Sequence, residues 1–120
     1  MNCSNGNMID MVRGDTKRLF FYRKDISGHV ITTKADKVFF TVKRSEFDES
    51  PLFQKILNHG ITFNEDFSYS LRITPEDTNR LEYGEYVYDI EIINLMGSKR
   101  TIAKGKFNLT WESTWQVNEA

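Results

Sequence analysis

The chain has 120 residues and a formal net charge of -1, from 16 Lys and Arg against 17 Asp and Glu. This length corresponds to one domain, and the near-zero charge excludes a whole-molecule field that would hold nucleic acid. No apolar run approaches the roughly 20 residues of a membrane-spanning helix, so we expect no membrane contact of that kind. Aromatic residues make up 13% against two prolines, which favours strands over helices.

The ends of the chain are polar. Residues 1–8 begin with neither a basic segment nor an apolar stretch, so we interpret them as a flexible leader and not as a signal peptide. The single cysteine, Cys3, lies in that leader without a base beside it, which indicates an inert thiol made in a reducing cytoplasm. Residues 9–115 are expected to form the domain, and residues 116–120 a short tail.

The first predicted strand covers residues 16–24. Leu19 and Phe21 lie on one face at period two, and Phe20 and Tyr22 lie on the other. Turn chemistry follows at Asp25 to His29. The strand is therefore expected to carry aromatic side chains on both faces.

The next strand, residues 37–43, places Val38, Phe40 and Val42 on one face. Residues 51–57 fit either a short helix or a strand, and we prefer the strand. Asn58-His59-Gly60 is a tight-turn signal, so residues 61–63 are expected to pair back on that strand as a hairpin.

Three further strands follow, each with clear alternation of apolar and polar residues: 68–74, 86–92 and 99–111. In the last one, Ile102 has the opposite parity to the other apolar residues, and Gly105 is close to it. This mismatch predicts a β-bulge.

A short helical turn is predicted near residues 75–81, because Thr74 precedes a proline and two carboxylates. In immunoglobulin-like domains such a turn links the two sheets, and a following tyrosine bonds back to the upstream backbone. Leu81, Gly84 and Tyr86 fit this tyrosine corner, with residues 76–80 as the expected acceptor. The predicted fold is an all-β, immunoglobulin-like antiparallel sandwich of about seven strands.

Residues suited to catalysis or metal binding are few. His29 and His59 lie in predicted turns, and the carboxylates at 48–49 and 65–66 lie in loops without the glycine pattern of a calcium site. Arg13-Gly14-Asp15 is a tripeptide of integrin ligands, but a turn before the first strand explains it. We therefore expect no enzyme, no cofactor and no metal.

The candidate interface consists of aromatic residues away from the core parity, with basic residues at the rim: Phe20, Tyr22, Phe39, Trp115, Arg18 and Lys43. Residues 13–44 carry nine Lys and Arg against three Asp and Glu, while residues 45–94 carry three against eleven. We interpret these opposite charges as pairing between neighbouring strands of one molecule; an interface role is the alternative.

Several segments resemble small virion proteins of tailed phages and prophages of Gram-positive bacteria, similar to the N-terminal domain of phage upper baseplate proteins. They are Met11 to Thr16, Ala35 to Lys43, Ile73 to Thr78, Tyr83 to Ile90 and Lys104 to Phe107. The resemblance covers about residues 9–115 and concerns fold markers. It implies an immunoglobulin-like sandwich that attaches to a larger tail or baseplate assembly and catalyses nothing.

The resemblance leads us to expect a virion structural protein whose partners are other tail or baseplate proteins, or copies of itself in a ring. A carbohydrate-binding module that recognises a host-surface glycan is the alternative. For that function Tyr22, Phe39, Trp111 or Trp115 would have to form a flat exposed platform. Sandwich folds host both functions, so the fold does not choose between them.

Overall fold

The computed structural model describes residues 5–111, which form eight strands and one short helix. In chain order these elements are β1 Asn5–Val12, β2 Lys17–Tyr22, β3 Lys37–Lys43, β4 Phe53–Leu57, β5 Gly60–Phe63, β6 Ser68–Ile73, α1 Pro75–Thr78, β7 Gly84–Ile93 and β8 Lys99–Thr110.

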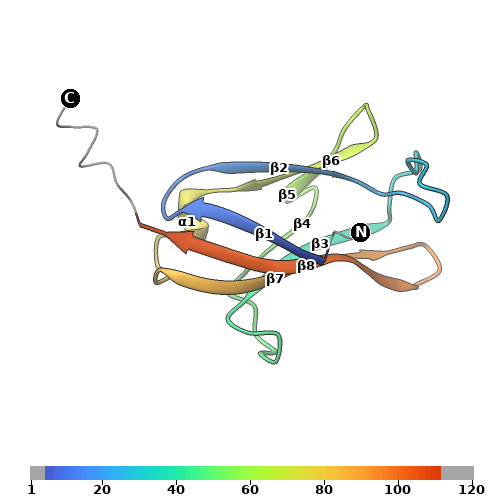
Figure 1. Cartoon of the computed structure of the whole chain (residues 1–120). Coiled ribbons are helices and arrows are strands. Elements are labelled where there is room, and N and C mark those ends of the chain that lie inside the picture. The colour runs from blue at the N-terminus through green and yellow to red at the C-terminus, as the bar shows by residue number, and fades with distance from the viewer. Residues whose placement is uncertain (1–4, 112–120) are drawn as a thin grey trace.

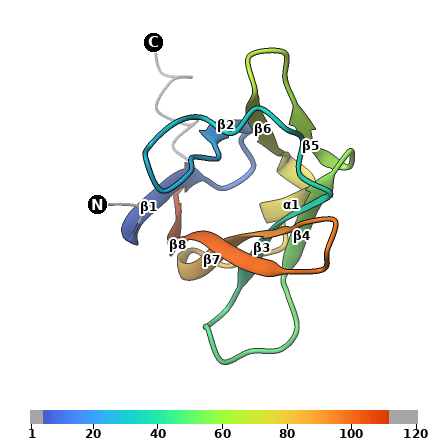
Figure 2. The same cartoon turned by 90° about the vertical axis from the view of Figure 1, so that its right-hand side faces the viewer.

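The strands form one hydrogen-bonded sheet in the order β1-β8-β7-β3-β4-β5-β6-β2, which folds over into two layers (Figure 1). Figure 2 shows β2, β5 and β6 in one layer, facing β3, β7 and β8 in the other. The fold is an all-β, immunoglobulin-like sandwich, as the alternating pattern predicts. Five of its strand pairs are antiparallel, as expected, and two, β1 with β8 and β4 with β5, are parallel.

The core lies between the two layers and is built from every second residue of the strands. Val38, Phe40 and Val42 of β3 are fully buried, as their period-two spacing predicts. From the other layer, Tyr69 is fully buried and its hydroxyl accepts a hydrogen bond from the backbone N–H of Ala35, at 2.9 Å. Burial of one face of each strand is the main force that folds the sheet over on itself.

The sequence pattern locates the long strands well. β3 matches the predicted residues 37–43, and residues 53–57 are a strand, as preferred over a helix. The β7–β8 register shifts between Ile90 and Glu91, which pair with Ala103 and Thr101. Ile102 is the extra residue, which confirms the predicted bulge.

The interpretation of residues 1–8 as a flexible leader is wrong for residues 5–8, which belong to β1. Met11 of this strand is buried, and Ile9 packs against the core. The apolar alternation here is limited to Ile9 and Met11, which is too short to predict a strand. The segment becomes a strand because it pairs in parallel with β8, which is distant in the sequence. Residues 1–4 and 112–120, which include the predicted tail at 116–120, lie outside the described residues.

The predicted hairpin at residues 58–60 does not form. Instead Ile56 pairs with Gly60 and Leu57 with Ile61 in parallel, so the chain steps sideways and continues into the other layer. Asn58 and Gly60 have φ angles of 76° and 104°, with one residue between them. Because these two left-handed backbone conformations flank His59, they shift the chain sideways and do not reverse its direction.

The predicted tyrosine corner forms, with a different acceptor residue. Tyr86 is buried, and its hydroxyl donates a 2.6 Å hydrogen bond to the backbone carbonyl of Glu82. The expected acceptor was within residues 76–80, so this detail is wrong. Leu81 is buried beside the corner, and Gly84 adopts a φ of 143° with open space around it, so its role is conformational.

An ion pair holds the helical turn against β4. Lys55 Nζ lies 2.7 Å from Asp77 Oδ2, and both side chains are only 14% exposed. The same carboxylate oxygen accepts hydrogen bonds from the backbone N–H and the hydroxyl of Thr74, at 2.7 and 3.0 Å. A Cβ on Gly60 would lie 2.6 Å from Cδ of Lys55, so the lysine stem packs directly on the β4–β5 step. The pair thus connects two points at which the chain passes between layers.

Tyr86→Phe is expected to lower the free energy of unfolding by about 1 kcal/mol, because the Glu82 carbonyl loses its donor inside the fold. The matched control is Tyr88→Phe, since Tyr88 is also buried and its hydroxyl makes no hydrogen bond to the described residues. Urea denaturation of the two variants measures both values. Equal losses would contradict the corner role.

Lys55→Met and Asp77→Asn are each expected to lower the free energy of unfolding by about 2 kcal/mol, because each leaves a mostly buried partner uncompensated. The double variant should lose less than the two single losses combined, since no isolated charge remains. A double-mutant cycle by chemical denaturation checks this. Strictly additive losses would show that the two side chains do not interact.

Candidate protein-contact surface

The outward face of β2 carries the exposed aromatic residues that the sequence singled out. Strand alternation directs Leu19 and Phe21 toward the core, while Phe20 is 63% exposed and Tyr22 44% exposed. Their cross-strand neighbours on β6 are Ser70 and Ser68, which are too small to cover an aromatic ring. The predicted division of this strand into two faces is confirmed.

A hydrogen bond fixes the orientation of Tyr22. Its hydroxyl donates to Asp66 Oδ2 at 3.2 Å, which ties β2 to the loop between β5 and β6. Hydrogen bonds from the Ser68 hydroxyl and backbone N–H lower the pKa of Asp66. The Asp66 charge in turn raises the pKa of Tyr22, because a phenolate beside a carboxylate is unfavourable. This hydrogen bond favours one orientation of the Tyr22 ring.

Two arginines lie directly opposite each other beside these aromatic rings. Arg18 of β2 pairs with Arg72 of β6, and both are exposed. Like charges at such a position repel each other, so an anionic group placed between them would be stabilised. In the ion pairs observed among the described residues, carboxylates of residues 45–94 bind lysines instead of these arginines. Asp77 binds Lys55, Glu85 binds Lys106 and Glu91 binds Lys99.

The remaining interface candidates do not join this face. Phe39 and Lys43 lie on β3, which β4, β5 and β6 separate from β2 in the sheet order. Phe39 is half-buried between Ile56 and Glu91 on the neighbouring strands. Trp115 lies outside the described residues. The structure therefore reduces the predicted patch to Arg18, Phe20 and Tyr22, and adds Arg72.

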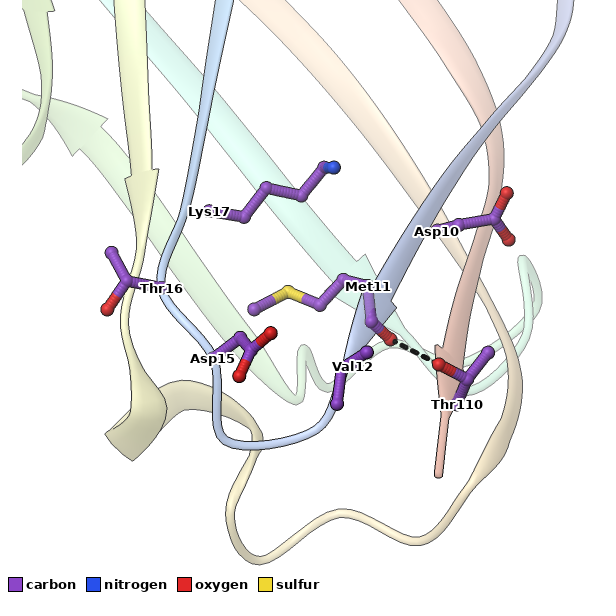
Figure 3. Close-up of a pocket in the computed structure, with 7 residues that line it drawn as sticks. All are labelled: Asp10, Met11, Val12, Asp15, Thr16, Lys17 and Thr110. Atoms are coloured by element: carbon purple, nitrogen blue, oxygen red, sulfur yellow. Dashed lines mark hydrogen bonds between the residues drawn. The ribbon is translucent and has the colours of Figure 1, made fainter. Parts of the chain in front are cut away.

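An opening separates β1 from β2, the two ends of the sheet order. It has a volume of about 270 Å³ and is lined by residues from both strands and from β8, among them Asp10, Met11, Lys17 and Thr110 (Figure 3). The Thr110 hydroxyl donates to the backbone carbonyl of Met11 at 3.3 Å, which holds β1 to β8. Among the strands that the structure describes, none pairs with β1 or β2 on the side that faces this opening.

A second, larger hollow of about 890 Å³ follows the bulged β7–β8 hairpin and reaches Lys43 and Glu46. Asp89 lies on this outward face, opposite Thr41 and Lys104. Partial burial raises the pKa of Asp89, the nearby Glu91 raises it further, and Lys43 among other lysines opposes the shift. The walls of this hollow carry both signs of charge, from Glu46 and Asp89 and from three lysines, Lys43, Lys104 and Lys106.

An aromatic cluster that the sequence reasoning missed lies at the α1 end. The rings of Tyr83 and Trp111 stack with centroids 4.1 Å apart, and the Arg13 guanidinium lies 4.5 Å from the Tyr83 centroid. Arg13 also donates to the Leu81 carbonyl at 3.3 Å, and the Gly14 N–H donates to Thr78 Oγ1 at 3.0 Å. The Arg13-Gly14-Asp15 tripeptide is thus a turn anchored to the tyrosine corner. Only strand register brings Tyr83 and Trp111 together, so no local signal in the sequence reveals the pair.

His29 is exposed, with Nδ1 3.9 Å from Asp25. Within residues 5–111, no group of three or more His, Cys, Asp or Glu side chains is placed to hold a metal ion. In the same part of the chain, no helix has the length and apolar character needed to cross a membrane.

No known protein family matches the sequence, and no curated protein is similar to it. Among solved structures, the chain is similar to CopC from Methylosinus trichosporium OB3b, with 11% identity, a TM-score of 0.49 and coverage of 88% of this chain and 86% of that one. It is also similar to the V domain of amphioxus IgVJ-C2, with 10% identity, a TM-score of 0.31 and coverage of 84% and 98%.

Asp89→Asn is expected to stabilise the protein at neutral pH by less than about 1 kcal/mol. Because folding raises the pKa of Asp89 above 3.8, the native state holds the proton more tightly than the unfolded state. The free energy of unfolding therefore falls as pH rises from about 3.8 through the raised pKa, and the variant lacks this fall. Denaturation at several pH values, with the exposed Glu85→Gln as control, measures it. An unchanged pH profile would contradict the assignment.

Proposed function

We propose that this chain is a non-enzymatic structural module of a tailed-phage or prophage virion. It attaches to other tail or baseplate proteins, or to copies of itself, by protein–protein contact. The observation that carries this proposal is the β2 face, where Phe20 and Tyr22 of the edge strand are exposed beside Arg18 and beside Arg72 of the neighbouring β6. Aromatic residues and arginines are the residue types enriched at protein interfaces.

Several features support contact with a protein. The Tyr22 ring is oriented by Asp66, so little conformational freedom is lost when a partner packs on it. The arginine pair adds a charge preference, which sets orientation and the rate of encounter. The motifs that resemble phage upper baseplate proteins cover the strands and the corner that build this sandwich, and this resemblance supplies the virion context.

A carbohydrate-binding module remains the second candidate, and one observation favours it. Trp111 is 71% exposed and stacks on Tyr83, so its ring is supported from one side. A flat, supported ring can stack on the apolar face of a sugar. This platform lies at the α1 end and does not include the β2 face.

The proposal predicts that the chain is a component of purified virions of the phage or prophage that encodes it. After induction, mass spectrometry of density-purified particles should detect it, and immunogold labelling should place it on the tail. Phe20→Ser with Tyr22→Ser should reduce its incorporation at least about tenfold, because aromatic anchors carry much of the affinity of an interface. Leu95→Ser with Met96→Ser, which changes exposed apolar residues of the β7–β8 turn, is the matched control.

Absence of the chain from purified particles would contradict the virion function. Binding on a glycan array that is lost in Trp111→Ala and kept in Phe20→Ser with Tyr22→Ser would favour the carbohydrate-binding module instead.

A further inference from the structure

The free edge of β2 has the geometry of a site for strand addition. Among the described residues β2 pairs only with β6, so alternate backbone N–H and C=O groups along its other side have no strand partner. Such an edge is a template for another extended segment.

The outward side chains along this edge define what an added strand must carry. Tyr22, Phe20 and Arg18 follow one another at period two, with Arg72 across from Arg18. Cross-strand pairs that stabilise a sheet are aromatic with aromatic, aromatic with β-branched, and opposite charges. The fitting segment therefore has an aromatic, a β-branched and an acidic residue, each two positions apart.

We propose that residues 113–119 of a second copy of this chain add to β2 as an antiparallel strand. This segment carries Trp115, Val117 and Glu119 at period two. In an antiparallel register that places Trp115 beside Tyr22, the same spacing places Val117 beside Phe20 and Glu119 beside Arg18. The inference rests on the proposed function and names its partner.

Charge along the two segments is complementary. Residues 112–119 contain Glu112 and Glu119 and no basic residue, whereas residues 13–24 contain five Lys and Arg and one Asp. Glu119 would lie against the Arg18–Arg72 pair and reduce its repulsion. The residues on the other face of the segment, Gln116 and Asn118, are polar. They would face the opening between β1 and β2 that Asp10 and Lys17 line.

Topology favours a second copy over the chain's own segment. β8 ends at Thr110, which pairs with Val12 at the end of β1, and residues 13–16 then connect β1 to β2 at the same end. The chain's own segment would have to cross that connection to reach β2, and connections in folded domains do not cross in this way. Between copies the contact is head-to-tail, so it builds chains or closes into rings.

The contact is small. A strand of seven residues buries less than about 1,200 Å², the low end for specific interfaces, so we expect micromolar affinity and association only at high protein concentration. A symmetric virion would supply the high local concentration that such a contact needs.

The first test uses a fluorescein-labelled peptide of residues 111–119 and the full chain. Fluorescence anisotropy should show micromolar binding, with no binding of a scrambled peptide. Phe20→Ser with Tyr22→Ser should weaken binding at least about tenfold, and Leu95→Ser with Met96→Ser should leave it unchanged. Thermal unfolding of each variant confirms that it is folded.

The second test uses charge reversal. Arg18→Glu in the full chain should weaken binding of the peptide about fivefold, and a peptide with Glu119→Lys should restore most of it. Loss without restoration would contradict the proposed register.

The third test uses two full-length variants and sedimentation velocity. Variant one carries Phe20→Ser and Tyr22→Ser on the edge, and variant two carries Trp115→Ser and Val117→Ser in the segment. Each alone should stay monomeric where the unsubstituted chain associates. Their equimolar mixture should stop at a dimer, since only one intact edge and one intact segment can meet.

A mixture that stays monomeric, or an unsubstituted chain that neither associates nor binds the peptide, would overturn the inference. If the chain is still found in purified virions, the proposed function stands and only this contact is wrong. If the chain is absent from virions and yet forms the mixed dimer, the contact stands and the virion function is wrong.

Discussion

The ion pair between Lys55 and Asp77 joins two places where the chain passes from one layer of the sandwich to the other. One is the sideways step at Asn58 and Gly60, on which the lysine stem packs, and the other is the turn that begins at Thr74. Because both side chains are mostly buried, each depends on the other for compensation of its charge. The same corner also receives the β1–β2 turn through Gly14 and Thr78. One end of the molecule is thus organised around this carboxylate.

This organisation has a consequence at the sheet edges. The β1–β2 turn is fixed to the helical turn, but the two strands that leave it join different layers and leave an opening between them. A sandwich of this connectivity keeps β1 and β2 as edges. On β2 this edge carries Phe20, Tyr22 and Arg18, and Arg18 lies opposite Arg72 of β6, a combination that disfavours pairing with another basic edge.

The candidate surface was only partly predictable. Phe20 and Tyr22 follow from strand alternation alone, since residues at even positions of β2 must oppose Leu19 and Phe21. Arg72 and the Trp111–Tyr83 stack were missed, because both depend on which strands are neighbours. Phe39 was expected to join the patch and does not. The even or odd position of a residue tells which face of its strand it occupies, but not which layer the strand belongs to.

By itself the sequence determined the all-β class, the inward residues of the long strands, the bulge at Ile102 and the corner tyrosine. Each of these depends on local periodicity or on a few adjacent residues. Tertiary structure decided the parallel pairing of β1 with β8, the sidestep in place of a hairpin at residues 58–60, and the free edge of β2. The physical reason is that strand pairing is stabilised by hydrogen bonds and side-chain contacts between segments far apart in the chain, which no local pattern encodes.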